Sequence, residues 1–232
     1  MDLVIAGAII KDYSMIEKCI ESLPDYDFNN KFILFDGYSG FGGDKEPFLS
    51  QYNAYKEYIA KKYPDFLVIS FDENIYFRDM IEKICEISNA ERLFVIQDDV
   101  IAHKMDLKQI EIQMNYIEDL KILCFPHKYI PPEGTHWYEP FDDTYPLPFI
   151  KSHGFSERIF ICDRLNMINI CNDSPKNNKM EKRFIEFIYQ TTMKRRIWKV
   201  GSDKEKEIYW KKFGSYFHHD ITHTHQCGKR RI

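Results

Sequence analysis

The stretch "RLFVIQDDVIAHKM", Arg92 to Met105, joins an apolar run to two adjacent carboxylates. The run "RLFVIQ" has the length of a strand that is buried on both faces, as in parallel sheets covered by helices. It ends in Asp98 and Asp99, and another apolar pair follows them. Two like charges at the end of a buried strand are costly unless a cation or hydrogen-bond donors meet them. The stretch therefore predicts a central strand with a functional group at its carboxyl end.

Three other apolar runs of strand length precede this one, at residues 3–10, 31–37 and 66–71. Helical patterns of apolar residues lie between the runs, at residues 15–23, 48–55 and 77–85. This alternation of strand and helix implies right-handed crossovers. We expect an α/β fold, a Rossmann-type sandwich in which a central, mostly parallel sheet is flanked by helices.

Composition excludes several classes of protein. The chain has 232 residues, enough for one domain with a full core, and its net charge of -4 argues against nucleic acid as a main partner. No segment approaches the ~20 apolar residues of a membrane span. The six cysteines form no CxxC pair, and several fall on apolar faces of the expected elements. We expect a reduced, cytoplasmic protein.

Polar residues gather where the expected strands end. Asp36 ends the second strand, Arg78 opens the helix after the third, and Asp98 with Asp99 ends the fourth. Alone, Asp36 is typical of an ordinary turn and Arg78 of a solvated first helical turn. Ligands in such sheets bind at the carboxyl ends of strands. Because Mg2+ and Mn2+ need only one or two protein carboxylates beside a diphosphate, the sequence predicts a metal-bound diphosphate here.

With this strand order, an acid ending the second strand and a strand closing in "QDD", the sequence resembles a GT-A fold glycosyltransferase. It is similar to the family 2 enzymes, which use nucleotide sugars. The resemblance implies that Asp99 ligates Mn2+ or Mg2+ and that Asp98 lies by the ribose or the donor sugar. The family's motif reads DxD or EDD, and Gln97 stands where an acid often sits. This departure argues against a second direct acidic ligand from the motif.

The resemblance also places a nucleobase in the first half of the chain. It would lie against the backbone around Ala6 and Ala8, with the carboxylate of Asp36 accepting a hydrogen bond from the base and Arg78 facing the nucleotide. A UDP-linked donor is favoured over guanosine or thymidine donors. In a single domain, residues 1–104 would form the nucleotide-binding half and residues 105–232 the acceptor-binding half.

The second half begins with an expected helix at 105–120 and a strand at 121–125. The segment 126–149 is rich in proline and aromatics, as functional loops often are. Its aromatics would stack on sugar rings of a glycan, or would simply pack the loop down; they are Trp137, Tyr138, Phe141 and Tyr145. A strand is expected at 154–165 and a helix at 177–190.

Transfer with inversion requires a base that deprotonates the acceptor hydroxyl. In the family, this base is an Asp or Glu at the start of the helix that follows a second-half strand. Glu181 occupies that place. The alternative is that Glu181 is a solvated helix residue. Asp142 and Asp143 are then the substitutes, because their loop would also reach the acceptor.

The segment "YFHHDITHTHQC", residues 216–227, contains four of the eight histidines. The resemblance implies that one late histidine binds the metal, either His219 or His223. A zinc site is the rival interpretation, but the spacing matches no standard zinc pattern.

The sequence thus favours a metal-dependent hexosyltransferase that moves a sugar from a nucleotide sugar to a glycan or another hydroxyl acceptor. A sugar nucleotidyltransferase is an alternative, although "IAGAIIKDY" is a poor match to the Gly-rich, basic phosphate loop of that class. A second alternative is a non-catalytic domain that binds sugar or nucleotide. The joint presence of Asp36, Asp98, Asp99 and the late histidines argues against it.

Overall fold

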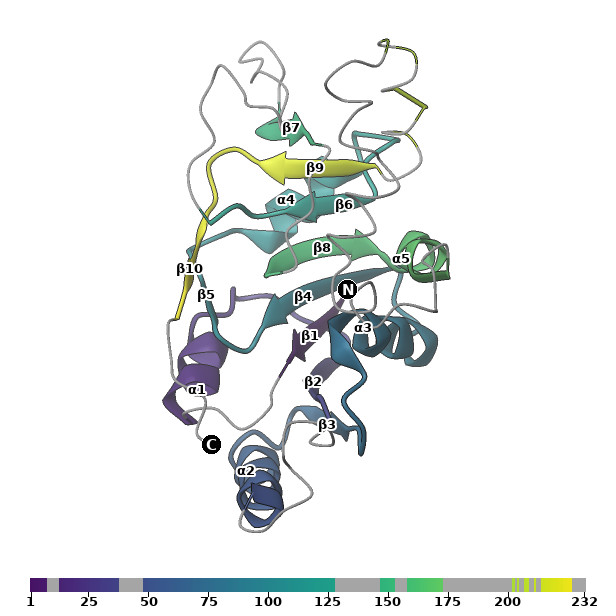
Figure 1. Cartoon of the computed structure of the whole chain (residues 1–232). Coiled ribbons are helices and arrows are strands. Elements are labelled where there is room, and N and C mark those ends of the chain that lie inside the picture. The colour runs from purple at the N-terminus through teal and green to yellow at the C-terminus, as the bar shows by residue number, and fades with distance from the viewer. Residues whose placement is uncertain are drawn as a thin grey trace.

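The computed structural model describes residues 1–7, 13–37, 48–127, 147–152, 158–172 and 214–226, together with positions 202, 204, 207, 208 and 211 (Figure 1). The strands are β1 (Asp2–Ala6), β2 (Lys31–Phe35), β3 (Leu67–Ser70), β4 (Arg92–Gln97), β5 (Val100–Ala102), β6 (Ile122–Cys124), β7 (Phe149–Lys151), β8 (Ile159–Asp163), β9 (Ser215–His218) and β10 (His223–His225). Among the described residues, the α-helices are α1 (Tyr13–Glu21), α2 (Phe48–Lys62), α3 (Tyr76–Ile87), α4 (Leu107–Met114) and α5 (Arg164–Asn172).

One sheet of eight strands forms the centre of the molecule, in the order β3-β2-β1-β4-β8-β6-β9-β7 (Figure 1). The strands β3, β2, β1 and β4 are parallel to one another. Strand β8 runs antiparallel between β4 and β6, β9 pairs parallel with β6, and β7 closes the edge antiparallel to β9. The predicted mostly parallel sheet is confirmed. Strands from both halves of the chain share it.

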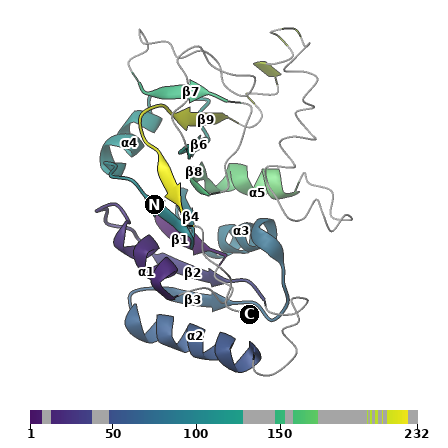
Figure 2. The same ribbon diagram turned by 60° about the vertical axis from the view of Figure 1, so that its left-hand side comes forward.

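Side chains alternate across the sheet and separate two apolar cores. In β4, Phe94 and Ile96 belong to one core, whereas Leu93 and Val95 belong to the other. Helices α1, α2 and α4 contribute to the first core, and α3 and α5 to the second, so the layers are helix, sheet and helix (Figure 2). Burial of each such side chain stabilises the fold by about 1.5–3 kcal/mol. Full burial on both faces explains why these strands read as continuous apolar runs.

Two helix starts show where the expected elements needed revision. The run expected as a strand over 154–165 forms β8 only to Asp163, whose Oδ1 accepts the N–H of Asn166 at 2.9 Å and opens α5. The helix expected over 105–120 spans Leu107–Met114, after Asp106 accepts the N–H of Gln109 at 3.0 Å. Aspartate satisfies the unpaired N–H groups of a first helical turn, which is why both helices begin there. The helix expected over 177–190 lies outside the described residues.

A membrane-crossing helix was not expected. Within the described ranges, no helix has the length and apolar character to cross a bilayer.

Candidate functional site

The carboxyl ends of β1, β2 and β4 lie side by side. Ala6 pairs with Leu34 on one side and with Gln97 on the other. The backbone N–H of Asp98 donates to Ala6 O at 3.2 Å, and Asp98 is only 1% exposed. The structure therefore brings together four of the sequence-predicted site residues at one edge of the sheet: Ala6, Asp36, Asp98 and Asp99.

Gly7 lets the chain leave β1 close to Asp98. Its φ is +102°, a conformation that side-chain-bearing residues rarely adopt. A Cβ at this position would lie 3.3 Å from Asp98 Oδ1. Gly7 was not among the predicted residues, although it stands between the predicted Ala6 and Ala8. The glycine in "AGA" was the available signal.

Asp36 and Gly37 fasten the end of β2 to the loop between β3 and α3. Asp36 is buried, and its Oδ1 accepts the N–H groups of Gly37 at 2.9 Å and Ile75 at 2.8 Å. The Tyr52 hydroxyl donates to the Asp36 backbone carbonyl at 3.0 Å. A Cβ on Gly37 would lie 2.0 Å from the backbone carbonyl of Glu73, so only glycine fits. The Asp-Gly pair thus has a structural role beside the predicted nucleobase contact.

The C-terminal strand β10 returns to the end of β4. It pairs antiparallel with β5, which places His225 opposite Val100 and His223 opposite Ala102. The N–H of Gln226 donates to Asp99 O at 2.7 Å, and His225 Nε2 lies 3.3 Å from Asp99 Oδ2. His225 is the functional candidate that sequence reasoning missed. Its signal was the alternation in "HTH", which puts two imidazoles on one face of a strand.

His223 is buried behind this pair, with 1% of its surface exposed. Its Nδ1 lies 2.9 Å from Phe125 O, and because a carbonyl only accepts, Nδ1 carries the proton. Burial lowers the pKa of His223 to about 4, although the bond to Phe125 opposes this shift. The ring is therefore neutral near pH 7, and Nε2, which has no hydrogen-bond partner among the described residues, keeps its lone pair.

His219 lies at the turn after β9. Its backbone N–H donates to Pro148 O at 2.7 Å, and its Nδ1 is 2.7 Å from Asp220 Oδ1. The assignment of His219 to the metal stays a prediction.

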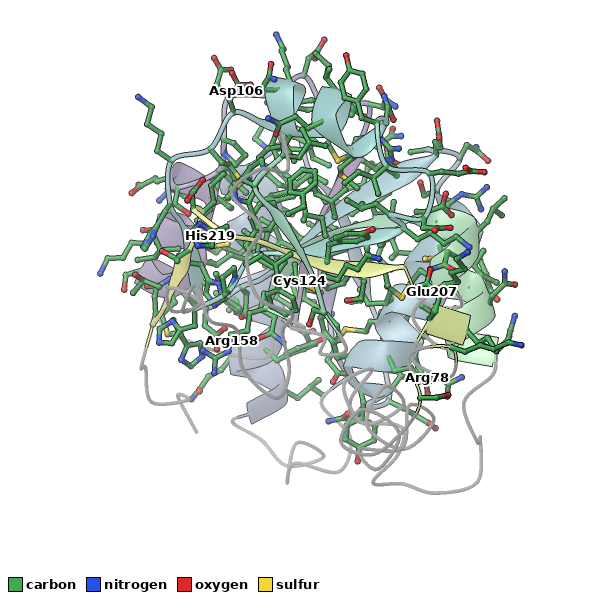
Figure 3. All side chains as sticks on the ribbon, turned by 90° about the horizontal axis from the view of Figure 1, so that it is seen from above. Arg78, Asp106, Cys124, Arg158, Glu207 and His219 are labelled. Atoms are coloured by element: carbon green, nitrogen blue, oxygen red, sulfur yellow. The ribbon has the colours of Figure 1, made fainter. Side chains whose placement is uncertain are left out.

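Arg78 is held between α3 and α5. Its guanidinium is buried, donates to Cys171 O at 2.8 Å, and lies 3.0 Å from Asp79 Oδ1 and 3.3 Å from Glu82 Oε2. Figure 3 shows Arg78 on the opposite side of the view from His219. These contacts give Arg78 a structural role, and its predicted contact with the nucleotide stays a prediction.

The other predicted residues lie outside the described residues: Ala8, Asp142, Asp143, Glu181 and the aromatics Trp137, Tyr138, Phe141 and Tyr145. Among the residues that are described, no three His, Cys, Asp or Glu side chains lie close enough together to hold a metal ion by themselves. Asp99 and His225 supply one carboxylate and one imidazole. Such a small protein contribution suits Mg2+ or Mn2+, which take further ligands from phosphates and water.

No protein-family model matches this sequence. No curated protein matches it either.

Solved structures do match the fold. Mannosyltransferase PcManGT from Pyrobaculum calidifontis in complex with GDP-Man and Mn2+ gives a TM-score of 0.52 at 9% identity, over 84% of this chain and 51% of that one. S. aureus TarS 1-349 gives 0.53 at 12% identity, over 97% of this chain and 60% of that one. GalNAc-T7 with UDP, GalNAc and Mn2+ gives 0.54 at 10% identity, over 98% and 43%. The chain spans about half the length of these structures, and its predicted GT-A-like fold is confirmed.

Proposed function

We propose that this GT-A-like chain transfers a sugar from a nucleoside diphosphate sugar to a hydroxyl group of a glycan or another acceptor. UDP is the favoured nucleotide, the sugar is a hexose, and the anomeric centre is inverted. The observation that carries the proposal is the pair Asp99 and His225. They meet at 3.3 Å at the carboxyl end of β4, beside the buried Asp98.

Asp99 and His225 would hold Mn2+ or Mg2+. A carboxylate oxygen and an imidazole nitrogen are both ligands that Mn2+ accepts, and Mg2+ favours the carboxylate. His223 is a further candidate, because its Nε2 keeps a lone pair while Nδ1–H bonds to Phe125 O. Histidine ligands in metal sites commonly donate their other nitrogen in this way. When bound, the cation would offset the negative charge of the diphosphate.

The donor would lie along the edge formed by β1, β2 and β4. Asp36 would accept from the nucleobase, the backbone at Ala6 and Ala8 would border it, and Asp98 would bind the ribose or the sugar. Support comes from Gly7, since its missing side chain leaves room against Asp98 Oδ1. Without a side chain at Gly7, a sugar or ribose hydroxyl has room to approach the buried carboxylate of Asp98.

Glu181 is the proposed base, with Asp142 and Asp143 as substitutes. The base takes the proton of the acceptor hydroxyl while that oxygen attacks the anomeric carbon from the face opposite the diphosphate. Loss of a general base typically slows a reaction by roughly 100-fold to 10,000-fold. Glu181→Gln should therefore keep donor binding and lose most of the transfer.

The test measures nucleoside diphosphate released from UDP-, GDP- and dTDP-hexoses in the presence of Mn2+. Water serves as the acceptor where no glycan is known, and NMR of the product reports its anomeric configuration. Release from one class of donor, with inversion, is the expected result. The matched control is Glu86→Gln, which changes an exposed glutamate of α3 paired with Lys83 at 2.8 Å.

A nucleotide-binding domain without catalysis is the second candidate. It would bind nucleoside diphosphates with Mn2+ and release none from any donor sugar. Failure to bind any nucleotide would contradict both candidates. Release with retention of configuration would contradict the role given to Glu181.

A further inference from the structure

Arg158 lies at the point where β8 meets the end of β4. Its backbone carbonyl accepts the N–H of Gln97 at 2.8 Å, one step beyond the pair of Ile96 with Ile159. Because β8 runs antiparallel to β4, the start of β8 lies at the carboxyl end of β4. Arg158 therefore stands at the edge of the sheet that holds Asp98 and Asp99.

The hydrogen bonding of Arg158 differs from that of the other arginines in the described ranges. Arg78 bonds to Cys171 O, Arg92 donates to Asn115 Oδ1 at 2.7 Å, and Arg164 donates to Ala90 O and Cys85 O at 3.0 Å. Each of these three thus has a structural partner. The guanidinium of Arg158 is half-buried, yet it has neither a hydrogen bond nor an ion pair among the described residues.

The surroundings of Arg158 locate its charge. Arg158 directly precedes Ile159, which pairs with Ile96 in the sheet, and Asp98 follows Ile96 by two residues. In Figure 3, Arg158 lies on the same side of the view as His219, away from Arg78 and Glu207. A cation without an ion-pair partner in the described part of the chain thus lies at the edge that carries the candidate metal ligands. A half-buried guanidinium without a partner is suited to an anionic ligand.

We propose that Arg158 binds the diphosphate of the donor and stabilises it as it departs. This inference rests on the proposed function. A guanidinium offers paired N–H donors that match phosphate oxygens, and it is charged at all relevant pH values. In the "QDD" motif, Asp98 and Asp99 only accept hydrogen bonds, and the amide of Gln97 can donate but carries no charge.

The reaction explains why a fixed cation is needed at this place. A bond forms between the acceptor oxygen and the anomeric carbon, and the bond from that carbon to the phosphate oxygen breaks. The electron pair of the broken bond stays on the diphosphate, and the acceptor proton goes to the base. Negative charge on the diphosphate therefore grows in the transition state. A preorganised donor aimed at this charge lowers the barrier more than it strengthens ground-state binding.

The test is calorimetric titration of wild-type protein, Arg158→Ala and Arg158→Lys with UDP and with uridine, in the presence of Mn2+. Charge-assisted hydrogen bonds are worth about a tenfold to hundredfold change in affinity. Arg158→Ala should raise the Kd for UDP by that factor and leave the Kd for uridine unchanged. Arg158→Lys should fall between the two. In donor turnover, kcat should fall more than KM rises.

The matched control is Arg92→Ala. Arg92 lies at the opposite end of β4, where it stands opposite Asp163 of β8 in the sheet register. That variant should bind UDP as the wild type does. Equal UDP affinity in Arg158→Ala and wild type would overturn the inference while the proposed function stands. Equal loss for UDP and uridine would also overturn it, since the effect would then not act through the phosphates. A wild type that binds neither UDP nor GDP would overturn the proposed function and the inference with it.

Discussion

Replacement of Asp36 separates its structural role from its proposed role in binding. Its Oδ1 accepts two backbone N–H groups, from Gly37 and Ile75, and the side chain is 4% exposed. A hydrogen bond to a charged acceptor contributes about 1.5 kcal/mol or more, so Asp36→Ala should cost about 3 kcal/mol of unfolding free energy. That is a large share of the about 5–15 kcal/mol typical of a domain. Asp36→Asn keeps an oxygen at the Oδ1 position and should lose less than half as much.

The assay is urea denaturation of the wild type, Asp36→Ala and Asp36→Asn, monitored by far-UV circular dichroism. UDP binding is measured separately in the absence of urea. Asp36→Asn should be folded but should bind UDP more weakly, because its amide nitrogen cannot accept a hydrogen bond from the base. Asp36→Ala with wild-type stability would refute the structural reasoning. Asp36→Asn with wild-type affinity for UDP would show that the nucleobase lies elsewhere.

Three further predictions concern packing, pH and the thiols. Gly37→Ala should destabilise the protein by about 1–3 kcal/mol in the same urea assay, because the new Cβ would lie 2.0 Å from the Glu73 carbonyl. Burial lowers the pKa of His218 to about 4. Neutral His218 therefore makes its full contribution to the free energy of unfolding above pH 6.5. That free energy should fall as the pH drops toward 4, by up to about 1.4 kcal/mol per pH unit. The plot of unfolding free energy against pH should be less steep for His218→Asn. Burial raises the pKa of Cys171 to about 12, so Ellman's reagent should modify this thiol only on unfolding.

The parallel half of the fold could be predicted because its signals are local. Strand β4 is apolar at every position from Leu93 to Ile96, and burial on both faces requires that pattern. The helix α3 shows its buried stripe in Phe77, Met80, Ile81 and Ile84. Strand order then placed Asp36, Asp98 and Asp99 at one edge without any knowledge of distances.

The remainder of the site depends on contacts between distant parts of the chain. His225 reaches Asp99 because β10 pairs with β5, and each of these strands has only three residues. So short a strand carries too few residues for its alternation to stand out from a loop. Arg158 reaches the same edge because β8 enters the sheet antiparallel beside β4. Nothing in the local sequence of either residue specifies that pairing.

The helix α5 shows a different limit. Its start depends on Asp163, which reads equally well as the last residue of an apolar strand and as a helix cap. The hydrophobic pattern of β8 continues into Leu165, which the structure leaves 62% exposed. A pattern of polarity alone could not distinguish these cases.

Binding of UDP with and without Mn2+ tests most directly the claim that Asp99 and His225 hold a metal for a bound diphosphate. Calorimetry would compare the wild type with Asp99→Asn, and with Asp106→Asn as the control, because asparagine caps α4 as well as aspartate does. The wild type and the control should bind UDP at least about tenfold more tightly with Mn2+ than with EDTA, the scale of one charge-assisted contact. Asp99→Asn should lose that difference. Equal affinity with and without Mn2+ in the wild type, or an unchanged difference in Asp99→Asn, would contradict the account.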